Sequence, residues 1–139
     1  MKVVFADTGY WVAVLGPKDN LSVKAHAISS SFGKFRILTT EMVLDELLAA
    51  LSSLPVRLLA IQGVDAIRAN PNVEVVPQTS IQFREAFDLY KKMADKEWSL
   101  TDCASFEIMK ARGISEALAH DRHFEQAGFR ALLRGTSPL

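Results

Sequence analysis

Apolar residues fall into two alternating patterns along the chain, and together they predict strands separated by helices. Short apolar runs typical of buried strands occupy 2–6, 36–39, 73–76, 117–119 and 130–133. Helical spacing or helix-forming composition marks the intervening segments, at 8–15, 22–31, 40–51, 56–69, 80–96, 101–112 and 121–127. Strands that alternate with helices predict an α/β fold, with a short parallel sheet of five strands and helices on both faces.

Local signals set the ends of several helices. Thr39 or Thr40 is expected to cap the helix that follows the second strand, and Thr101 to cap the helix that ends at Gly113. Gly16-Pro17 and Asn70-Pro71 should end the first and fourth helices. The expected apolar face of the 40–51 helix comprises Val43, Leu44, Leu47, Leu48 and Leu51, and the 80–96 helix carries Phe83, Phe87, Tyr90 and Ala94 at helical spacing.

Length and composition narrow the class of protein. The 139 residues fit one domain, which we expect to span 1–139. The single cysteine, Cys103, excludes an internal disulfide and a cysteine-cluster zinc site, and it suits a reducing cytosol. We expect a cytoplasmic protein with no role in membranes, because no run approaches the roughly 18 apolar residues of a membrane span and the opening does not read as a secretory signal. Lys plus Arg equals Asp plus Glu at 16 each, which argues against a generic nucleic-acid binder.

Four acids fall where a parallel sheet binds ligands, beyond the carboxyl ends of its strands. Asp7 follows the first strand and Asp121 follows the fourth. Asp102 lies in the first turn of a helix whose start should face the same edge, and Glu46 lies about two turns into the helix that leaves the second strand. Because crowded carboxylates repel, they call for a hard cation such as Mg²⁺ or Mn²⁺. Such a metal activates water and stabilises charge on a phosphodiester.

Each acid also has a purely structural interpretation. Asp7 could begin an Asx-turn, Asp102 could complement the helix dipole, and Asp121 could cap the helix toward Phe124. Glu46 could face solvent, as most helical glutamates do, although apolar neighbours on its helix disfavour full exposure. Position alone therefore does not decide between a metal site and four separate caps and turns.

The residues around the four acids are more specific. Residues 4–8 read Val-Phe-Ala-Asp-Thr, and residues 39–47 read Thr-Thr-Glu-Met-Val-Leu-Asp-Glu-Leu. Residues 98–106 read Trp-Ser-Leu-Thr-Asp-Cys-Ala-Ser-Phe, and Asp-Arg-His-Phe at 121–124 precedes Ala-Gly-Phe at 127–129. In this order, and over nearly the whole chain, these blocks resemble the PIN-domain family. The block at 98–106 is the strongest match, to a toxin-type, VapC-like branch.

The resemblance implies a metal-dependent endoribonuclease that uses Mg²⁺ or Mn²⁺ and cleaves single-stranded or looped RNA. In this branch the substrates are structured RNAs of the translation machinery, which makes tRNA or rRNA the expected class. The resemblance assigns Asp7, Glu46, Asp102 and Asp121 as the catalytic acids that hold the metal. It also implies the toxin of a toxin–antitoxin pair, inhibited by a small antitoxin protein that places a basic side chain among the carboxylates, and often a homodimer.

Two positions depart from the family pattern. Gly9 stands where Ser or Asn is common, and Ala119 stands where Thr or Ser often lies two positions before the last Asp. Each departure removes a possible hydrogen bond to a metal-holding group, which could loosen metal affinity, and Thr8 and Ser105 are candidates to compensate. These departures motivate an alternative, a degenerate PIN module that binds RNA or protein without cleavage. Retention of all four acids speaks against it.

Other reactive side chains favour structural interpretations. Cys103 has no histidine beside it in sequence to activate a thiol, so we expect it to pack in the core. His120 and His123 flank Asp121, but Mg²⁺ prefers oxygen ligands, so we expect them to pack or face solvent. Trp98 is expected to anchor the fold rather than to stack on RNA.

The second half of the chain is richer in cations, which could frame the acidic mouth and hold RNA phosphates despite the zero net charge. These cations are Lys91, Lys92, Lys96, Lys110, Arg112, Arg122, Arg130 and Arg134. A phospho-acceptor receiver domain shares a sheet of this general type. That class is disfavoured, because receivers resemble one another in a pair of acids after the first strand and this chain has only Asp7 there.

Overall fold

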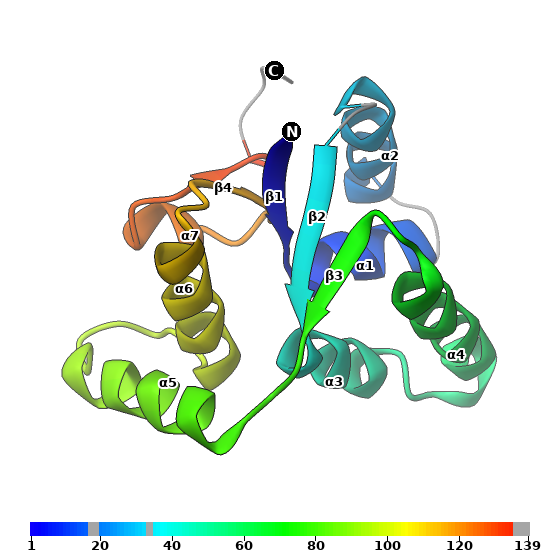
Figure 1. Cartoon of the computed structure of the whole chain (residues 1–139). Helices are drawn as coiled ribbons and strands as arrows, with labels where there is room; N and C mark the ends of the chain where they lie inside the picture. Colours follow the sequence, from blue (N-terminus) through cyan, green and yellow to red (C-terminus); the bar gives the residue numbers. More distant parts are fainter. Residues whose placement is uncertain (17–19, 33–34, 135–139) are drawn as a thin grey trace.

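Five parallel strands form one sheet in the computed structural model, which describes residues 1–16, 20–32 and 35–134 (Figure 1). The strands are β1 (Lys2–Ala6), β2 (Phe35–Thr40), β3 (Val73–Val76), β4 (Glu116–Leu118) and β5 (Arg130–Ala131). Their spatial order is β3-β2-β1-β4-β5, and every neighbouring pair is parallel. The predicted α/β fold with a short five-stranded parallel sheet is confirmed.

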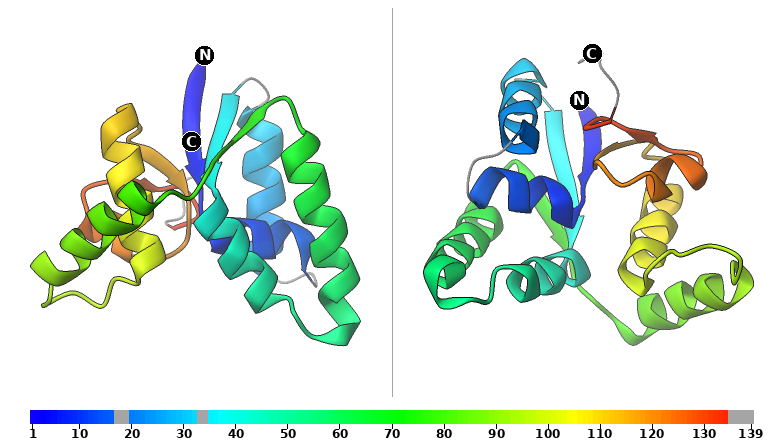
Figure 2. Two further views of the ribbon diagram at one scale, coloured as in Figure 1. Left: turned by 60° about the horizontal axis from the view of Figure 1, so that its bottom comes forward. Right: turned by 180° about the vertical axis from the view of Figure 1, so that it is seen from behind.

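Helices cover both faces of this sheet (Figures 1 and 2). One face carries α1 (Thr8–Leu15), α2 (Asn20–Phe32), α3 (Glu41–Ala50) and α4 (Leu54–Ala69). The other carries α5 (Ser80–Lys92), α6 (Leu100–Arg112) and α7 (His123–Gln126). Within the described ranges, no helix is both long and apolar enough to span a bilayer.

The order of the strands explains the division of the helices. The chain first builds outward from β1 through β2 to β3, and then returns to the other side of β1 for β4 and β5. Because crossovers between parallel strands are right-handed, this reversal of direction moves the later helices to the opposite face. The boundary between β1 and β4 is therefore the topological switch point, where open sheets of this kind bind ligands.

The core lies along the central strand. Val4, Phe5 and Ala6 of β1 are fully buried, because β1 has strands on both sides and helices on both faces. Val43 and Leu47 of α3 are fully buried as well. This packing fixes the end of β1, and with it the position of the next residue, Asp7.

Two expectations about packing were wrong. Leu48 does not belong to the buried face of α3, since 39% of its surface is exposed. The 80–96 helix ends earlier than predicted, at Lys92, and a turn closed by a hydrogen bond from the Lys96 N–H to the Met93 carbonyl follows it. No glycine or proline marks this end in the sequence. The aromatic side chains at helical spacing on α5 are exposed, with Phe83 at 43%, Phe87 at 44% and Tyr90 at 48%.

The start of α6 also differs from the prediction. Ser99, not Thr101, is the N-cap, and its hydroxyl accepts a hydrogen bond from the backbone N–H of Asp102. Gly113 ends this helix as predicted, in the left-handed conformation at φ 67°. Gly16 ends α1 with a hydrogen bond from its N–H to the Val12 carbonyl, while Pro17 lies outside the described residues.

Candidate metal centre

Asp7 is the first acid at the switch point, and the fold delivers it directly from the end of β1. Its backbone N–H still bonds across to the Leu118 carbonyl of β4, at 3.2 Å. Its side chain is buried, 7% of its surface is exposed, and it does not cap α1 although Asp7 is the N-cap residue. Among the described residues, Oδ1 of Asp7 is buried without a hydrogen-bond partner. The interpretation of this side chain as an Asx-turn is therefore wrong.

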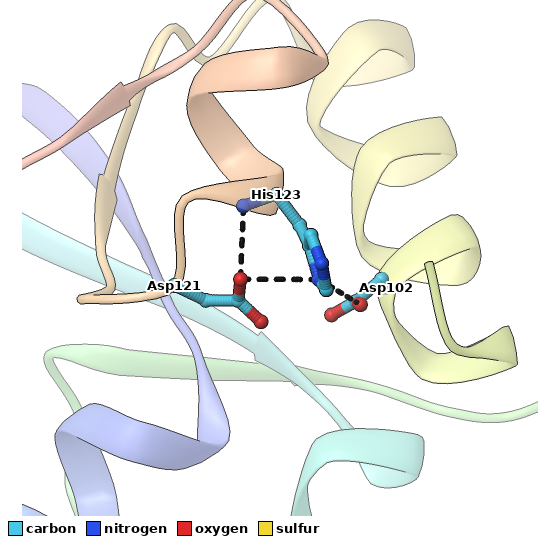
Figure 3. Close-up of side chains that lie close together, drawn as sticks. All are labelled: Asp102, Asp121 and His123. Carbon is cyan, nitrogen blue, oxygen red and sulfur yellow. Dashed lines mark hydrogen bonds and ion pairs between the residues drawn. The ribbon is translucent and has the colours of Figure 1, made fainter. Parts of the chain in front are cut away.

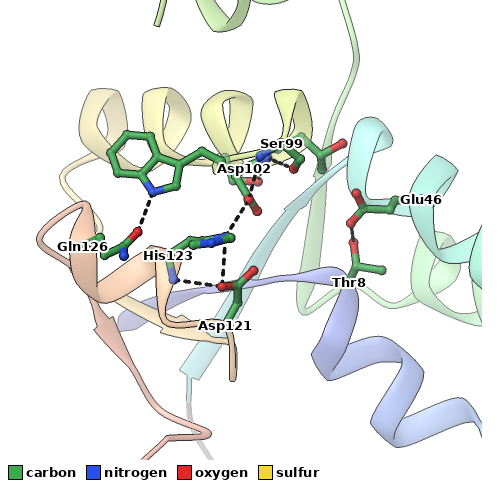
Figure 4. Close-up of polar contacts among 10 residues, drawn as sticks. Thr8, Glu46, Ser99, Asp102, Asp121, His123 and Gln126 are labelled. Carbon is green, nitrogen blue, oxygen red and sulfur yellow. Dashed lines mark hydrogen bonds and ion pairs between the residues drawn. The ribbon is translucent and has the colours of Figure 1, made fainter. Parts of the chain in front are cut away.

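Asp102 approaches the same place from the start of α6, held by a reciprocal capping box (Figure 4). Its Oδ2 atom accepts a hydrogen bond from the Ser99 N–H at 3.0 Å, and the Ser99 hydroxyl accepts from the Asp102 N–H at 3.0 Å. The structural interpretation of this acid therefore holds as well, since Asp102 does stabilise the helix start. The carboxylate is nevertheless buried, with 7% of the residue exposed.

Asp121 follows β4, and its neighbour His123 joins it to Asp102 (Figure 3). The backbone N–H of His123 donates to Oδ1 of Asp121 at 2.9 Å, so this acid also orders the turn that starts α7. The Nδ1 atom of His123 lies 3.1 Å from Oδ1 of Asp121 and 3.2 Å from Oδ2 of Asp102. These three side chains each offer one potential ligand atom, and the three atoms lie within 4.8 Å of one another.

Glu46 is the fourth predicted acid. It comes from α3 and lies across from Asp121 and His123 (Figure 4). Its Oε1 atom accepts a hydrogen bond of 2.5 Å from the hydroxyl of Thr8, the residue after Asp7. Glu46 is half-buried. It is therefore not the solvent-facing helical glutamate that its position alone allowed.

The electrostatics of the site relate Asp7 to the other three acids. The pKa of Asp7 is raised from an ordinary 3.8 to about 7, chiefly by burial; the Thr8 backbone N–H lowers it, and the charges of Asp102, Glu46 and Asp121 add smaller increases. Burial likewise raises the pKa of Asp102, with a contribution from Asp121, while the Ser99 N–H and His123 lower it. The other three acids predicted from the sequence are thus within electrostatic reach of Asp7.

The donor set fits a divalent cation. Carboxylate oxygens and one imidazole nitrogen converge, and a buried oxygen of Asp7 has no hydrogen-bond partner among the described residues. A buried polar atom of this kind costs free energy unless a partner satisfies it, and a cation would do so while offsetting the mutual repulsion of the acids. Mg²⁺ and Mn²⁺ both accept such ligands.

His123 is the residue that sequence reasoning undervalued. Its spacing of two from Asp121 gave a hint, but its approach to Asp102 depends on the packing of α7 against α6, which no local pattern encodes. His120 is exposed, as expected. Cys103 is fully buried, as expected, and burial raises the pKa of its thiol to about 11.

Trp98 anchors the fold beside the site, as predicted. It is 7% exposed, and its indole N–H donates to Oε1 of Gln126 at 3.0 Å (Figure 4). Its ring meets Phe106 edge-on, with the ring centroids 4.9 Å apart. Phe106 in turn meets Phe124 of α7 edge-on, at 4.9 Å. This aromatic stack ties α6 to α7, and so it holds Asp102 near Asp121.

Five of the eight cations expected to frame the mouth are engaged with acids. Arg112 makes a two-pronged bridge to Glu74, and Arg130 and Arg134 pair with Glu116 and Glu125. Lys91 and Lys96 pair with neighbouring aspartates. Within the described part of the chain, Lys92, Lys110 and Arg122 have no acid within ion-pair distance. Of these three, Arg122 adjoins the site in sequence.

The two departures from the family pattern are now placed. A Cβ added at Gly9 would meet no atom within 4 Å, so a larger residue is sterically tolerated there. Ala119 is fully buried. The Thr8 hydroxyl donates to Glu46, whereas the Ser105 hydroxyl donates to the Thr101 carbonyl within its own helix.

The strand order and the acid cluster place the chain in the class of α/β proteins that carry a group of carboxylates at the switch point of a parallel sheet. The family model of the PIN domain matches residues 4–130, and the chain belongs to this family. Similar curated proteins include the "23S rRNA-specific endonuclease VapC20" of Mycobacterium tuberculosis, from strains CDC 1551 and H37Rv. Each is 28% identical over 127 residues, which cover 91% of this chain and 95% of the relative.

A solved structure is similar to the same extent. It is the crystal structure of Mycobacterium tuberculosis VapC20, described as a sarcin–ricin loop cleaving toxin. It superposes with a TM-score of 0.82 at 28% identity, over 91% of this chain and 95% of the other. The fold and the toxin-type, VapC-like resemblance are therefore confirmed along nearly the full length.

Proposed function

We propose that this chain is a metal-dependent endoribonuclease of the toxin type. The observation that carries the proposal is the buried Asp7 carboxylate, which has an oxygen without a hydrogen-bond partner among the described residues and lies within electrostatic reach of three further acids. Such a group is costly to keep unless it serves a ligand. The similarity to VapC20 supports RNA cleavage as the reaction in which a metal bound by these acids would take part.

Asp7, Asp102 and Asp121 are the residues that would hold Mg²⁺ or Mn²⁺, and Glu46 would complete the set directly or through water. A bound metal would lower the pKa of a water molecule and stabilise the negative charge that develops on the phosphodiester. The chain itself fixes the carboxylates before substrate arrives, since Ser99 orients Asp102 and Thr8 orients Glu46. Preorganised groups of this kind need no rearrangement during the reaction.

The substrate proposed is a structured RNA of the translation machinery, rRNA or tRNA, with single-stranded or looped bases at the cleavage point. The relatives support this class, since their names specify 23S rRNA and the sarcin–ricin loop. An enzyme that cleaves such RNAs would act in the cytoplasm. Arg122 is exposed and stands between Asp121 and His123 in the sequence, so we propose that it contacts a phosphate beside the acids.

The alternative, a PIN module without catalytic activity, is not favoured. A protein without activity would have no reason to keep three further acids within electrostatic reach of the buried Asp7, yet all four acids are present. The departures at Gly9 and Ala119 leave these carboxylates in place.

A small antitoxin is the proposed inhibitor. Exposed apolar side chains gather on α4 and the adjoining part of α3. A groove of about 330 Å³ between these helices is lined in part by Leu48, Leu51 and Ile61. Apolar patches of this kind suit a protein partner. A basic side chain of that partner is proposed to enter the acidic centre, because pairs of arginine and carboxylate are directional and strong.

Homodimerisation is the second proposed interaction. The exposed aromatic ridge of α5 supports it, with ring centroids of Phe83 and Phe87 6.3 Å apart and those of Phe87 and Tyr90 6.4 Å apart. Light scattering coupled to size exclusion would measure the mass in solution. A Phe87→Glu variant should shift a dimer to monomer, and an unchanged mass would remove this ridge from consideration.

An RNA cleavage assay tests the proposed function. Purified protein is incubated with ribosomal RNA and bulk tRNA, with Mn²⁺, with Mg²⁺ or with EDTA. Cleavage should require metal, and Asp102→Asn should lower its rate by orders of magnitude while the fold persists. Asp45→Asn is the matched control, since Asp45 is an exposed acid of the same neighbourhood and should retain activity. Cleavage that continues at full rate in excess EDTA would defeat the proposal.

A further inference from the structure

The imidazole of His123 lies between two carboxylates that come from different elements. Nδ1 is 3.1 Å from Oδ1 of Asp121 and 3.2 Å from Oδ2 of Asp102, and only 19% of the side chain is exposed (Figure 3). The backbone N–H of the same residue fixes Asp121, at 2.9 Å. His123 is therefore a built part of the acidic centre rather than a residue on its rim.

The spacing of these atoms is that of neighbouring ligands around one cation. Ligands about 2.1 Å from an octahedral ion and at right angles to each other lie about 3 Å apart. The two separations at Nδ1 have this value, and the three potential ligand atoms all lie within 4.8 Å. Oδ1 of Asp7 is buried without a hydrogen-bond partner among the described residues, and this carboxylate feels the charges of Asp102 and Asp121, which is an independent sign that the cluster serves a ligand.

We propose that Nδ1 of His123 binds the divalent cation directly, beside Asp102 and Asp121, and that this nitrogen makes the centre prefer Mn²⁺ to Mg²⁺. Imidazole is a good ligand for transition metals, whereas Mg²⁺ favours oxygen and keeps its waters. Ligation requires the imidazole tautomer with its proton on Nε2, which leaves the Nδ1 lone pair free. The inference rests on the proposed function, since it concerns the metal of that same site.

A competing role for His123 uses the same geometry without ligation. An Nδ1–H group could donate hydrogen bonds to both carboxylates and only position them. His123→Asn separates the two roles, because the asparagine amide can still donate from about the Nδ1 position but has no ring nitrogen. His120→Asn is the matched control, an identical change at an exposed histidine outside the cluster.

The first experiment is electron spin echo envelope modulation spectroscopy of the full chain loaded with Mn²⁺. Wild type and His120→Asn should show hyperfine coupling to a ring nitrogen, and His123→Asn should lose it. Wild-type protein produced with nitrogen-15-labelled histidine provides a test that needs no variant. Its nitrogen hyperfine coupling should change to that of the heavier isotope. The chain has three histidines, so the His120→Asn control narrows the assignment.

The second experiment is calorimetric titration of EDTA-treated protein with Mn²⁺ alone and with Mg²⁺ alone. The Mn²⁺ affinity divided by the Mg²⁺ affinity should fall at least about tenfold in His123→Asn, chiefly through weaker Mn²⁺ binding. The same ratio should not change in His120→Asn. Wild type that binds Mn²⁺ without nitrogen coupling, or an unchanged ratio in His123→Asn, would overturn the inference and leave the proposed nuclease intact. Wild type that binds neither ion would overturn both.

Discussion

The hydroxyl of Thr8 donates a 2.5 Å hydrogen bond to Oε1 of Glu46, and so it joins the first residue of α1 to the middle of α3. Hydrogen bonds between a hydroxyl and a carboxylate at this length are strong. Thr8 directly follows Asp7, so one short segment supplies one acid of the centre and fixes another. The geometry of the metal centre therefore depends on a side chain that carries no charge.

Thr8→Val should weaken metal binding without disturbing the fold. Valine has nearly the same shape, but it leaves Glu46 without its partner. Loss of a side chain that orients a metal-holding group typically costs about 10–100-fold in metal affinity. Calorimetric titration with Mn²⁺ measures the effect. Thr8→Ser, which keeps the hydroxyl, should stay close to wild type, and equal affinities for Thr8→Val and Thr8→Ser would show that this bond has no role.

Ser99→Ala should destabilise the protein, whereas Thr101→Ala should not. The Ser99 hydroxyl caps α6, and loss of such a cap costs about 1 kcal/mol in the free energy of unfolding. Thr101 lies in the first turn, where its hydroxyl has no capping role. Urea unfolding of both variants measures the difference. Equal losses, or a larger loss for Thr101→Ala, would contradict the capping geometry.

That contrast also shows how far sequence reasoning reached. Thr101 was the cap expected from the sequence, whereas the capping box in the structure joins Ser99 to Asp102, three residues later. Helix periodicity predicted burial of Leu48, but α4 packs against α3 without covering it. Local patterns thus established the elements and their order, while the edges of each buried face depend on the packing of distant elements.

The four acids were predictable because strand ends and family blocks both mark them. His123 was not, because its place beside Asp102 comes from an aromatic stack of Trp98, Phe106 and Phe124 that draws α7 to α6. Nor could the sequence show that an oxygen of Asp7 is buried without a hydrogen-bond partner among the described residues, since burial is a property of the assembled sheet.

Gly9→Ala should stabilise the protein. Gly9 lies in the first turn of α1, and a Cβ there would meet nothing within 4 Å. Replacing a helical glycine by alanine restricts the unfolded chain, and it gains roughly 0.5–1 kcal/mol. Thermal unfolding measures the gain. A matched Gly63→Ala variant should lose stability instead, because its Cβ would lie 2.4 Å from a methyl carbon of Leu15.

Asp7→Asn should stabilise the metal-free protein in a way that depends on pH. The pKa of Asp7 is about 7 in the folded protein, against 3.8 for an ordinary aspartate. Below pH of about 4 the carboxyl is protonated in both states, so wild type and variant should unfold with similar free energies. As pH rises toward 7, only the unfolded state releases its proton readily, and wild type loses stability that the variant keeps. The difference should approach a few kcal/mol, since each pKa unit corresponds to about 1.4 kcal/mol.

Bound metal should make wild type more stable than Asp7→Asn, the reverse of the order expected without metal. Mn²⁺ at a hundred times its dissociation constant stabilises the folded state by about 2.7 kcal/mol, through mass action alone. Wild type should therefore gain melting temperature in millimolar Mn²⁺, and Asp7→Asn should gain much less because it lacks one ligand charge. Melting curves at pH 4 to 7.5, with EDTA and with Mn²⁺, measure both effects, with Asp45→Asn as the control at an exposed acid. If Asp7→Asn and wild type respond to pH and to metal in the same way, the four carboxylates do not act as one site, because both effects arise from the charge of Asp7 among the other three.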